Sequence, residues 1–267
     1  CEFYINHKNE IYMKKLTIAA LLVATVSLLC SCGQAPQPKT LHMTASNISA
    51  EQGGLSVVYQ IINPTDSVVE YGVHYKIDRL YGDDWVPMPV SDETMFIEII
   101  YSLQPGDTSQ LYSVELYPER FAYPAGEYRI RKDMYIGGEQ KTLTAPFTLE
   151  GERSLQPSVK FEVTPDVYDG VPEKITYAVT NETSRKIEFG TYFKMDRLVD
   201  SQWHEMPLSD ITFFNDLAIS PPQGKPYQDD IYMYGDKIEY PAGIYRLRKQ
   251  VKVNNEERTI YATFRIR

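Results

Sequence analysis

Apolar and polar residues alternate in short stretches along most of the chain, and this period of two predicts β-strands. Val57, Tyr59 and Ile61 share one face of a predicted strand, and Tyr128 and Ile130 share one face of another. Turn-forming residues interrupt these stretches about every 8 to 12 residues. No segment after the first forty residues sustains an apolar stripe of helical period. The pattern therefore predicts an all-β protein.

The pattern is written twice along the chain. Residues 72–92 recur at an offset of 118 as residues 190–210, and after the loss of one residue 123–132 recur as 240–249. A repeat of this length is a whole domain rather than a solenoid unit. Each copy has about seven short predicted strands, which is typical of a β-sandwich. We expect two domains, 41–150 and 158–267, joined by a linker over 151–157.

Two motifs carry a resemblance to a known family. Gly126-Glu127-Tyr128 and Gly243-Ile244-Tyr245 precede the last predicted strand of each copy and resemble the tyrosine corner of immunoglobulin-like sandwiches. Together with a Trp-x-x-x-Pro motif at Trp85 and Trp203, this order resembles the bacterial Ig-like domains of cell-envelope lipoproteins over nearly all of residues 41–267. The resemblance implies two tandem immunoglobulin-like β-sandwich domains, here without the inter-sheet cysteines of antibody domains.

The first forty residues resemble a lipoprotein leader. Residues 1–12 lack an initiating Met and precede a complete signal that starts at Met13, so we treat them as a spurious or fragmentary extension. An apolar run of 14 residues follows two lysines, and it is shorter than the about 20 residues that span a bilayer. Cys32 follows a small residue and has Leu29 three positions upstream, as in a bacterial lipobox. This implies a signal peptide over 13–31, a lipidated and acylated (for example palmitoylated) Cys32, and a tether over 32–40.

Composition narrows the function classes. Thirty-six acidic residues against 27 basic ones give a net charge of −9, and removing residues 1–31 makes it −10, which argues against a nucleic-acid partner. The 21 tyrosines favour β-sheets. No cysteine follows Cys32, so the exported part forms no disulfide. Among the lipoproteins that the leader resembles, those exported to the cell surface of Bacteroidetes usually carry acidic residues just after the lipidated cysteine. None directly follows Cys32, so the resemblance implies the periplasmic side of the outer membrane.

No catalytic motif is present. The chain lacks a His-Glu-x-x-His metalloprotease motif, a Gly-x-Ser-x-Gly nucleophile elbow and a phosphate-binding glycine loop, so we expect no enzyme activity and no cofactor. His42, His74 and His204 are scattered singly along predicted strands, so we expect no metal site.

Several polar motifs have both a structural and a functional interpretation. The acidic groups at Asp83-Asp84, 166–169 and Asp229-Asp230 are typical of turns, and calcium binding is the alternative. Asp66-Ser67-Val68 resembles the O-glycosylation acceptor of exported Bacteroidetes proteins.

Two sets of residues are candidates for ligand contact. Lys76 and Asp78 alternate with inward residues, as do Arg129 and Arg131, so these charged side chains point outward and form either cross-strand ion pairs or a ligand-facing stripe. The two tryptophans either pack at a sheet edge or form a sugar-stacking platform. The candidate residues are Lys76, Arg129, Arg131 and Trp85 in the first copy, and Lys194, Arg246, Arg248 and Trp203 in the second.

These observations predict a lipid-anchored cell-envelope protein that acts as a non-catalytic Ig-like binding or spacer module. Its expected partners are the membrane, through the anchor, and an envelope protein or a glycan. A carbohydrate-binding accessory lipoprotein, and a subunit or inhibitor of an envelope complex, remain open alternatives.

Overall fold

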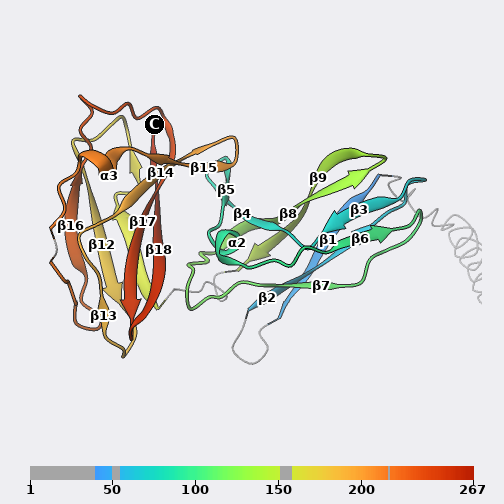
Figure 1. Cartoon of the computed structure of the whole chain (residues 1–267), viewed down its shortest axis with the longest axis horizontal. Coiled ribbons are helices and arrows are strands. Elements are labelled where there is room, and N and C mark those ends of the chain that lie inside the picture. The colour runs from blue at the N-terminus through green and yellow to red at the C-terminus, as the bar shows by residue number, and fades with distance from the viewer. Residues whose placement is uncertain (1–39, 50–54, 151–157, 216) are drawn as a thin grey trace, which may run out of the picture. The chain divides into compact units, whose positions relative to one another are not determined.

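A computed structural model describes residues 40–49, 55–150, 158–215 and 217–267 (Figure 1). The described part belongs to one compact unit that begins at Thr40. The predictions for the signal peptide, Cys32 and the linker lie outside the described residues.

The first repeat folds into two facing antiparallel sheets. The smaller sheet has the order β1 (His42–Ser49), β2 (Ser56–Ile62), β7 (Tyr112–Glu115). The larger sheet has the order β5 (Asp84–Pro87), β4 (Lys76–Tyr81), β8 (Gly126–Ile136), β3 (Val69–Gly72), β6 (Ile100–Leu103), with β9 (Glu139–Leu149) paired to β8, and a short helix, α2 (Val90–Glu93), follows β5. The long strand β8 pairs with β4 through residues 128–131 and with β3 through 134–136, while β9 occupies its other side.

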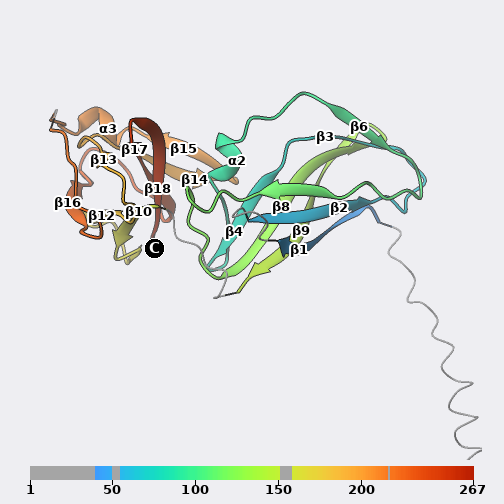
Figure 2. The same cartoon turned by 90° about the horizontal axis from the view of Figure 1, so that it is seen from below.

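The second repeat also forms a smaller and a larger sheet. Its smaller sheet has the order β10 (Val159–Thr164), β12 (Lys174–Asn181), β16 (Tyr227–Tyr232). Its larger sheet has the order β11 (Val167–Tyr168), β18 (Glu256–Ile266), β17 (Gly243–Val253), β14 (Lys194–Val199), β15 (Gln202–Met206), with β13 (Ile187–Glu188) paired to β17, and α3 (Leu208–Ile211) follows β15. This larger sheet differs from that of the first repeat, because the parallel strand β11 is added beside β18 and, among the described residues, no strand stands at the position of β6. The second view shows the same paired sheets from below (Figure 2).

Tight two-residue turns close the long hairpin of each domain. Gly137 and Gly138 connect β8 to β9 with φ of 59° and 85°, and Asn254 and Asn255 connect β17 to β18 with φ of 52° and 70°. Two successive left-handed residues match the twist of a hairpin, and Gly and Asn adopt that conformation most readily. The turns therefore fix the register of these 11-residue strands.

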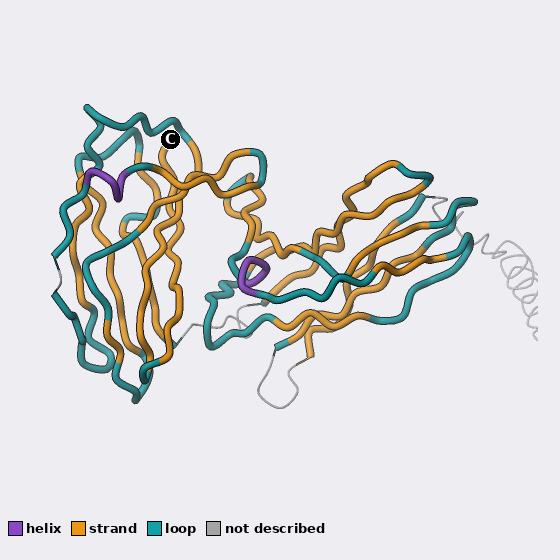
Figure 3. The backbone as a smooth tube through the Cα atoms, viewed as in Figure 1, coloured by secondary structure: helices purple, strands orange, loops and turns teal. Residues whose placement is uncertain are grey.

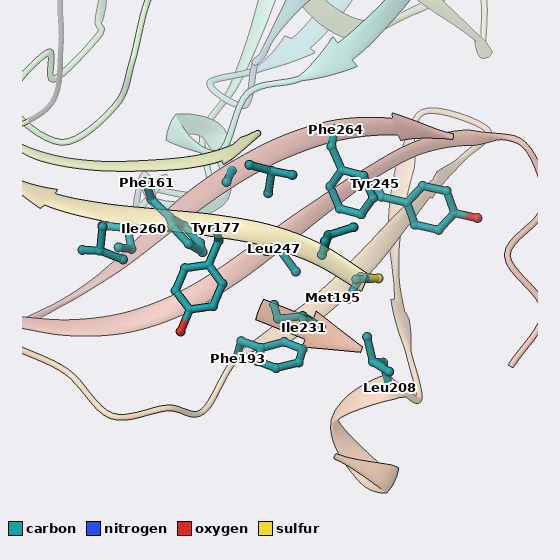
Figure 4. Packing of buried hydrophobic residues seen from close by; sticks show 14 of the residues in the cluster. Phe161, Tyr177, Phe193, Met195, Leu208, Ile231, Tyr245, Leu247, Ile260 and Phe264 are labelled. Atoms are coloured by element: carbon teal, nitrogen blue, oxygen red, sulfur yellow. The ribbon is translucent and has the colours of Figure 1, made fainter. Parts of the chain in front are cut away.

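Each domain has its own core between its two sheets. The strand positions predicted to point inward are buried, among them Val57, Tyr59 and Ile61 on β2. In the second core Tyr245 on β17 and Phe264 on β18 stack with their ring centroids 5.5 Å apart (Figure 4). The predicted fold class is confirmed.

The two predicted tyrosine corners are present. The hydroxyl of Tyr128 donates to the carbonyl of Pro124 at 2.7 Å, and that of Tyr245 donates to the carbonyl of Pro241 at 2.5 Å. Both hydrogen bonds fasten the loop before the penultimate strand to the start of that strand.

The structure differs from the prediction in its number of strands. Each domain has nine described strands rather than about seven, because short strands such as β13 lack the length to show an alternating pattern. The backbone view shows almost only strands and loops (Figure 3), and each described helix has four residues. Within the described ranges, no helix is long and apolar enough to cross a membrane.

Candidate functional site

The candidate residues of the first domain lie on the outer face of its larger sheet. β4 and β8 are neighbours, as expected, with Lys76 opposite Arg131 and Asp78 opposite Arg129. The Nε atom of Arg129 donates to Asp78 Oδ2 at 2.8 Å. Arg131 donates to both carboxylate oxygens, from Nε at 2.9 Å and from Nη2 at 3.0 Å. One carboxylate therefore holds two guanidinium groups.

Asp78 forms cross-strand ion pairs, which was one of the two interpretations of the outward charged residues, but it is also buried. Asp78 is only 1% exposed, and its counterpart Asp196 is 2% exposed. Both point away from the apolar core, but the arginine side chains of the neighbouring strand cover them. Strand alternation predicted correctly that Asp78 points away from the core, but it did not predict that Asp78 is buried.

The second domain repeats this cluster with two more charged groups. Asp196 accepts from Nε of Arg246 at 2.7 Å and from Nη2 of Arg248 at 2.7 Å. Arg248 also donates to Glu205 at 2.8 Å, and Lys194 donates to the same carboxylate at 2.9 Å. The hydrogen bond from Lys194 lowers the pKa of Glu205, and Glu205 in turn raises the pKa of Lys194.

The two tryptophans pack beneath arginines at the sheet edges. Trp85 on β5 and Trp203 on β15 are half-buried, and neither belongs to an apolar core. The guanidinium carbon of Arg129 lies 4.4 Å from the ring centroid of Trp85, and that of Arg246 lies 4.4 Å from that of Trp203. Cation–π packing therefore occupies a face of each ring that a sugar would need.

The second cluster also contacts the first domain. The indole nitrogen of Trp203 donates to the carbonyl of Pro87 at 3.3 Å, and Arg246 lies 3.3 Å from the carboxylate of Asp92. Arg246 is 8% exposed, less than its counterpart Arg129, which is only half-buried. These contacts add packing around the second cluster and leave Arg246 poorly accessible.

Lys76 differs from the other candidates. It is exposed, and among the described residues it has no ion-pair partner. Its counterpart Lys194 pairs with Glu205, whereas the first domain has Pro87 at the position of Glu205. The structure thus joins Arg129, Arg131 and Trp85 around Asp78, and Lys194, Arg246, Arg248 and Trp203 around Asp196, but leaves Lys76 outside.

One lysine in each domain is buried, which was not predicted from the sequence. Lys132 and Lys249 are 2% and 1% exposed and lie on the inward face of β8 and β17. Lys132 Nζ donates to the carbonyls of Gly72 and, at 2.7 Å, of His74, and Lys249 Nζ donates to that of Tyr192 at 3.0 Å. Strand alternation could have predicted this burial, because Lys132 shares the inward face of its strand with Tyr128 and Ile130.

Burial changes the acidity of these lysines. Desolvation lowers the pKa of Lys132 and of Lys249 to about 8. Aromatic rings help to hold the charge, since Lys132 lies 5.7 Å from the ring centroid of Tyr71 and Lys249 lies 5.3 Å from that of Tyr177. Each lysine ties a loop to its own strand. Lys132 holds the loop between β3 and β4 to β8, and Lys249 holds the loop between β13 and β14 to β17, which is a structural role.

The residues considered for metal binding are dispersed or already paired. Among the described residues, no group of three His, Cys, Asp or Glu side chains could hold a metal ion. His74 lies 3.6 Å from Glu98 at the surface. Asp230 accepts from Lys174 at 2.5 Å and from Thr176 at 2.7 Å, which accounts for its position without calcium.

The predicted glycosylation acceptor lies in an exposed turn. Ser67 is exposed, and the buried side chain of Asn63 holds the turn by donating to the Ser67 carbonyl at 2.9 Å. Asn181 makes the equivalent bond to Arg185 at 2.9 Å in the second domain. The turn is therefore a repeated structural feature, and glycosylation of Ser67 stays a prediction.

The paired sheets and the tyrosine corners define a tandem immunoglobulin-like architecture. The family model for the bacterial Ig-like domain matches residues 37–148 and again residues 155–265. The chain belongs to this family of bacterial Ig-like domains. No curated protein matches it.

Several solved structures show distant similarity. A transglutaminase of red sea bream is 10% identical with a TM-score of 0.26, over 85% of this chain and 31% of that one. An α2-macroglobulin of Escherichia coli is 10% identical with a TM-score of 0.28, over 87% and 22%. A DUF3823 family protein from Bacteroides ovatus is 12% identical with a TM-score of 0.25, over 85% and 98%. The chain thus spans under a third of the first two proteins, and similarities this weak do not bear on function.

Proposed function

We propose that the protein is a lipid-anchored, non-catalytic binding or spacer module of the cell envelope, on the periplasmic side of the outer membrane. The observation that carries this is the mutual pairing of the candidate groups. Asp78 and Asp196 each accept hydrogen bonds from two arginines, and Glu205 is shared by Lys194 and Arg248. Catalysis needs a tuned acid, base or nucleophile free to meet a substrate, and these groups are committed to one another.

The anchor rests on the lipobox-like residues before Cys32. Expression of the chain from Met13 in a bacterial host fed an alkynyl palmitate should label the wild-type protein. Cys32→Ser should lose the label and the membrane association, whereas the neighbouring Cys30→Ser should keep both. Label that survives Cys32→Ser would refute the assignment of the anchor.

The side of the membrane is tested separately. Protease added to intact cells should leave the protein uncut, and protease added after the outer membrane is permeabilised should cut it. Digestion in intact cells would place the protein on the cell surface instead.

The two alternatives are supported unequally. The arginine over each indole ring disfavours a glycan platform, because stacking needs a free aromatic face. Glycan-array binding that is lost in Trp85→Ala or Trp203→Ala would reinstate it. A role as a subunit that docks through a sheet edge is favoured by the exposed strand β6.

A further inference from the structure

The strand β6 is an open, apolar edge of the larger sheet in the first domain. It pairs with β3 on one side, and no strand of the described chain pairs with its other side. Ile100 on β6 is 78% exposed, and Met95 and Ile97 in the preceding segment are 96% and 65% exposed. Folded proteins usually protect such edges with charges, prolines or a covering element, because unpaired backbone groups accept another strand.

The backbone of β6 presents hydrogen-bonding groups to this open side. In the second domain Phe189 and Ile219 exchange two backbone hydrogen bonds of 3.0 and 2.8 Å. Tyr71 and Tyr101 are the equivalent pair in the first domain. Along an antiparallel strand, residues whose backbone groups bond to the neighbouring strand alternate with residues whose backbone groups point away from it. Since Tyr101 bonds to β3, the N–H and C=O groups of Ile100 and Ser102 point to the open side.

The second domain closes the same edge. Leu103 at the end of β6 corresponds to Pro221, which is followed by Pro222, and only the single bridge at Ile219 remains of the strand. Pro221 stands where Leu103 pairs with β3, so it ends the pairing with the strand behind it, and Pro222, at the next and outward position, has no N–H to offer an incoming strand. Of these two equivalent edges within the described residues, that of the first domain is therefore the one that an added strand can use.

Charge is also unevenly divided between the domains. Residues 41–150 carry 16 acidic and 7 basic side chains, a net charge of −9, whereas residues 158–267 carry 17 and 15, a net charge of −2. Glu70, which lies opposite Ser102, and Glu98 are exposed beside the edge. A second copy of this domain would meet like charge there, whereas a cationic segment would meet opposite charge.

We propose that β6 accepts an extended, positively charged segment of a partner protein as an added antiparallel strand. Backbone hydrogen bonds to Ile100 and Ser102 would supply affinity. Ile100, Ser102 and Glu70 lie on the outer face of the sheet, where Lys or Arg side chains of the segment would cover Ile100 with their methylene groups and approach Glu70 and Glu98. The apolar side chains that alternate with them would point to the inner face, beside Tyr101. This inference rests on the proposed binding function and names the class of its partner.

The test uses the full mature chain and a defined probe. A labelled peptide of alternating valine and lysine should bind saturably, and its affinity should fall as salt is added. The same peptide with glutamate at every lysine position should bind at least about tenfold more weakly. Hydrogen exchange should slow at the amides of Ile100 and Ser102 on binding, and should not change at Ser220 of the second domain.

Two variants of one residue isolate the backbone contribution. Ser102→Pro removes the outward N–H of an exposed edge residue and should weaken binding about tenfold. Ser102→Ala keeps that N–H and should bind within about twofold of the wild type. Circular dichroism checks that both variants fold, and if Ser102→Pro does not, the exchange pattern of the wild type decides.

Three results would overturn the proposal. They are equal binding of the glutamate peptide, protection away from β6, and concentration-dependent dimerisation that protects β6 without any peptide and grows with salt, as pairing between two acidic copies would. None of these results touches the anchor, because palmitate labelling of Cys32 is measured independently.

Discussion

At Asp78 a single buried carboxylate holds Arg129 and Arg131, so its removal leaves two guanidinium groups close together without a counterion. Asp78→Asn keeps the shape of the side chain and removes its charge. Breaking a buried ion pair on one side costs more than the pair contributes, and with the arginines partly exposed we expect a loss of about 2–4 kcal/mol in the free energy of unfolding. Urea denaturation followed by circular dichroism measures it.

The matched control for this change is an exposed pair. Glu188 and Lys186 are 2.7 Å apart with 43% and 71% of their side chains exposed, and Glu188→Gln should shift the urea midpoint far less than Asp78→Asn does, because water screens an exposed pair. Equal effects of the two substitutions would show that the Asp78 cluster contributes no more than a surface pair.

The buried lysines predict how stability depends on pH. The pKa of Lys132 and of Lys249 is about 8 in the folded protein, against an ordinary lysine value of 10.5. Between these values the unfolded chain binds more protons than the folded one, so stability rises with pH in this range. Above about pH 10 the trend reverses, because burial raises the pKa of Tyr128 to about 12 and exposed tyrosines of the unfolded chain ionise first.

Urea denaturation at pH 7.5 and 9.5 measures this effect. Each lysine should add roughly 1–2 kcal/mol to the free energy of unfolding over that interval. Lys132→Met should remove about half of the rise and the double variant with Lys249→Met should remove all of it. Lys141→Met, at an exposed position of β9, should leave the rise unchanged. A rise that persists in the double variant would assign it to other groups.

At the scale of the element, each tyrosine corner fixes the start of the penultimate strand. Tyr128→Phe removes the donor to the carbonyl of Pro124 and should cost about 1–3 kcal/mol. Tyr123 is a matched control, because it is fully buried nearby and its hydroxyl has no hydrogen-bond partner among the described residues. Tyr123→Phe should be neutral or stabilising, since it removes an unsatisfied polar group.

The second domain offers the same comparison. Tyr245 donates to Pro241 at 2.5 Å, while the buried hydroxyl of Tyr240 has no partner within the described part of the chain. Thermal unfolding of the four phenylalanine variants should separate Tyr128 and Tyr245 from Tyr123 and Tyr240. If the four midpoints coincide, the corner hydrogen bonds do not stabilise the fold.

Alternation along each strand predicted the faces well because the side-chain period of a strand is fixed at two. It assigned Val57, Tyr59 and Ile61 to the core correctly. The burial of Asp78 depends on how far the arginines of a neighbouring strand reach across it, which no single strand reveals.

The alternating sequence pattern also did not predict the very short strands. β13 has two residues, too few to alternate visibly. The open edge at β6 could not be predicted from one strand alone. It depends on which strands pair, because Leu103 still pairs with β3 in the first domain, whereas pairing in the second domain stops before the equivalent Pro221.

The pairing of the acidic groups with other side chains predicts that the folded protein does not need divalent cations for its stability. Asp84 lies 2.9 Å from a guanidinium nitrogen of Arg265, and Asp230 is held by Lys174 and Thr176. These carboxylates have protein partners in place of a cation. The thermal midpoint should therefore be the same in excess EDTA as in millimolar calcium. A calcium-dependent increase would reveal a site that binds the folded state.

The division of charge predicts that the two domains respond differently to salt. A net charge of −9 within residues 41–150 repels itself and destabilises the compact state, and salt screens that repulsion. The second domain, at −2, has little repulsion to screen. Because each domain contains one of the two tryptophans, Trp203→Phe leaves Trp85 to report on the first domain, and Trp85→Phe leaves Trp203 to report on the second.

Fluorescence-detected thermal unfolding of these two variants, at low salt and in about 0.5 M sodium chloride, measures the difference. A gain of about 1 kcal/mol should raise the midpoint of the first domain by about 4 °C or more, whereas the second should move by less than half of that. Each variant is the control for the other, since general salt effects act on both domains. Equal shifts would mean that the ion pairs around Asp78 and the solvent already neutralise the first domain, and the charge argument for a cationic partner at β6 would lose its basis.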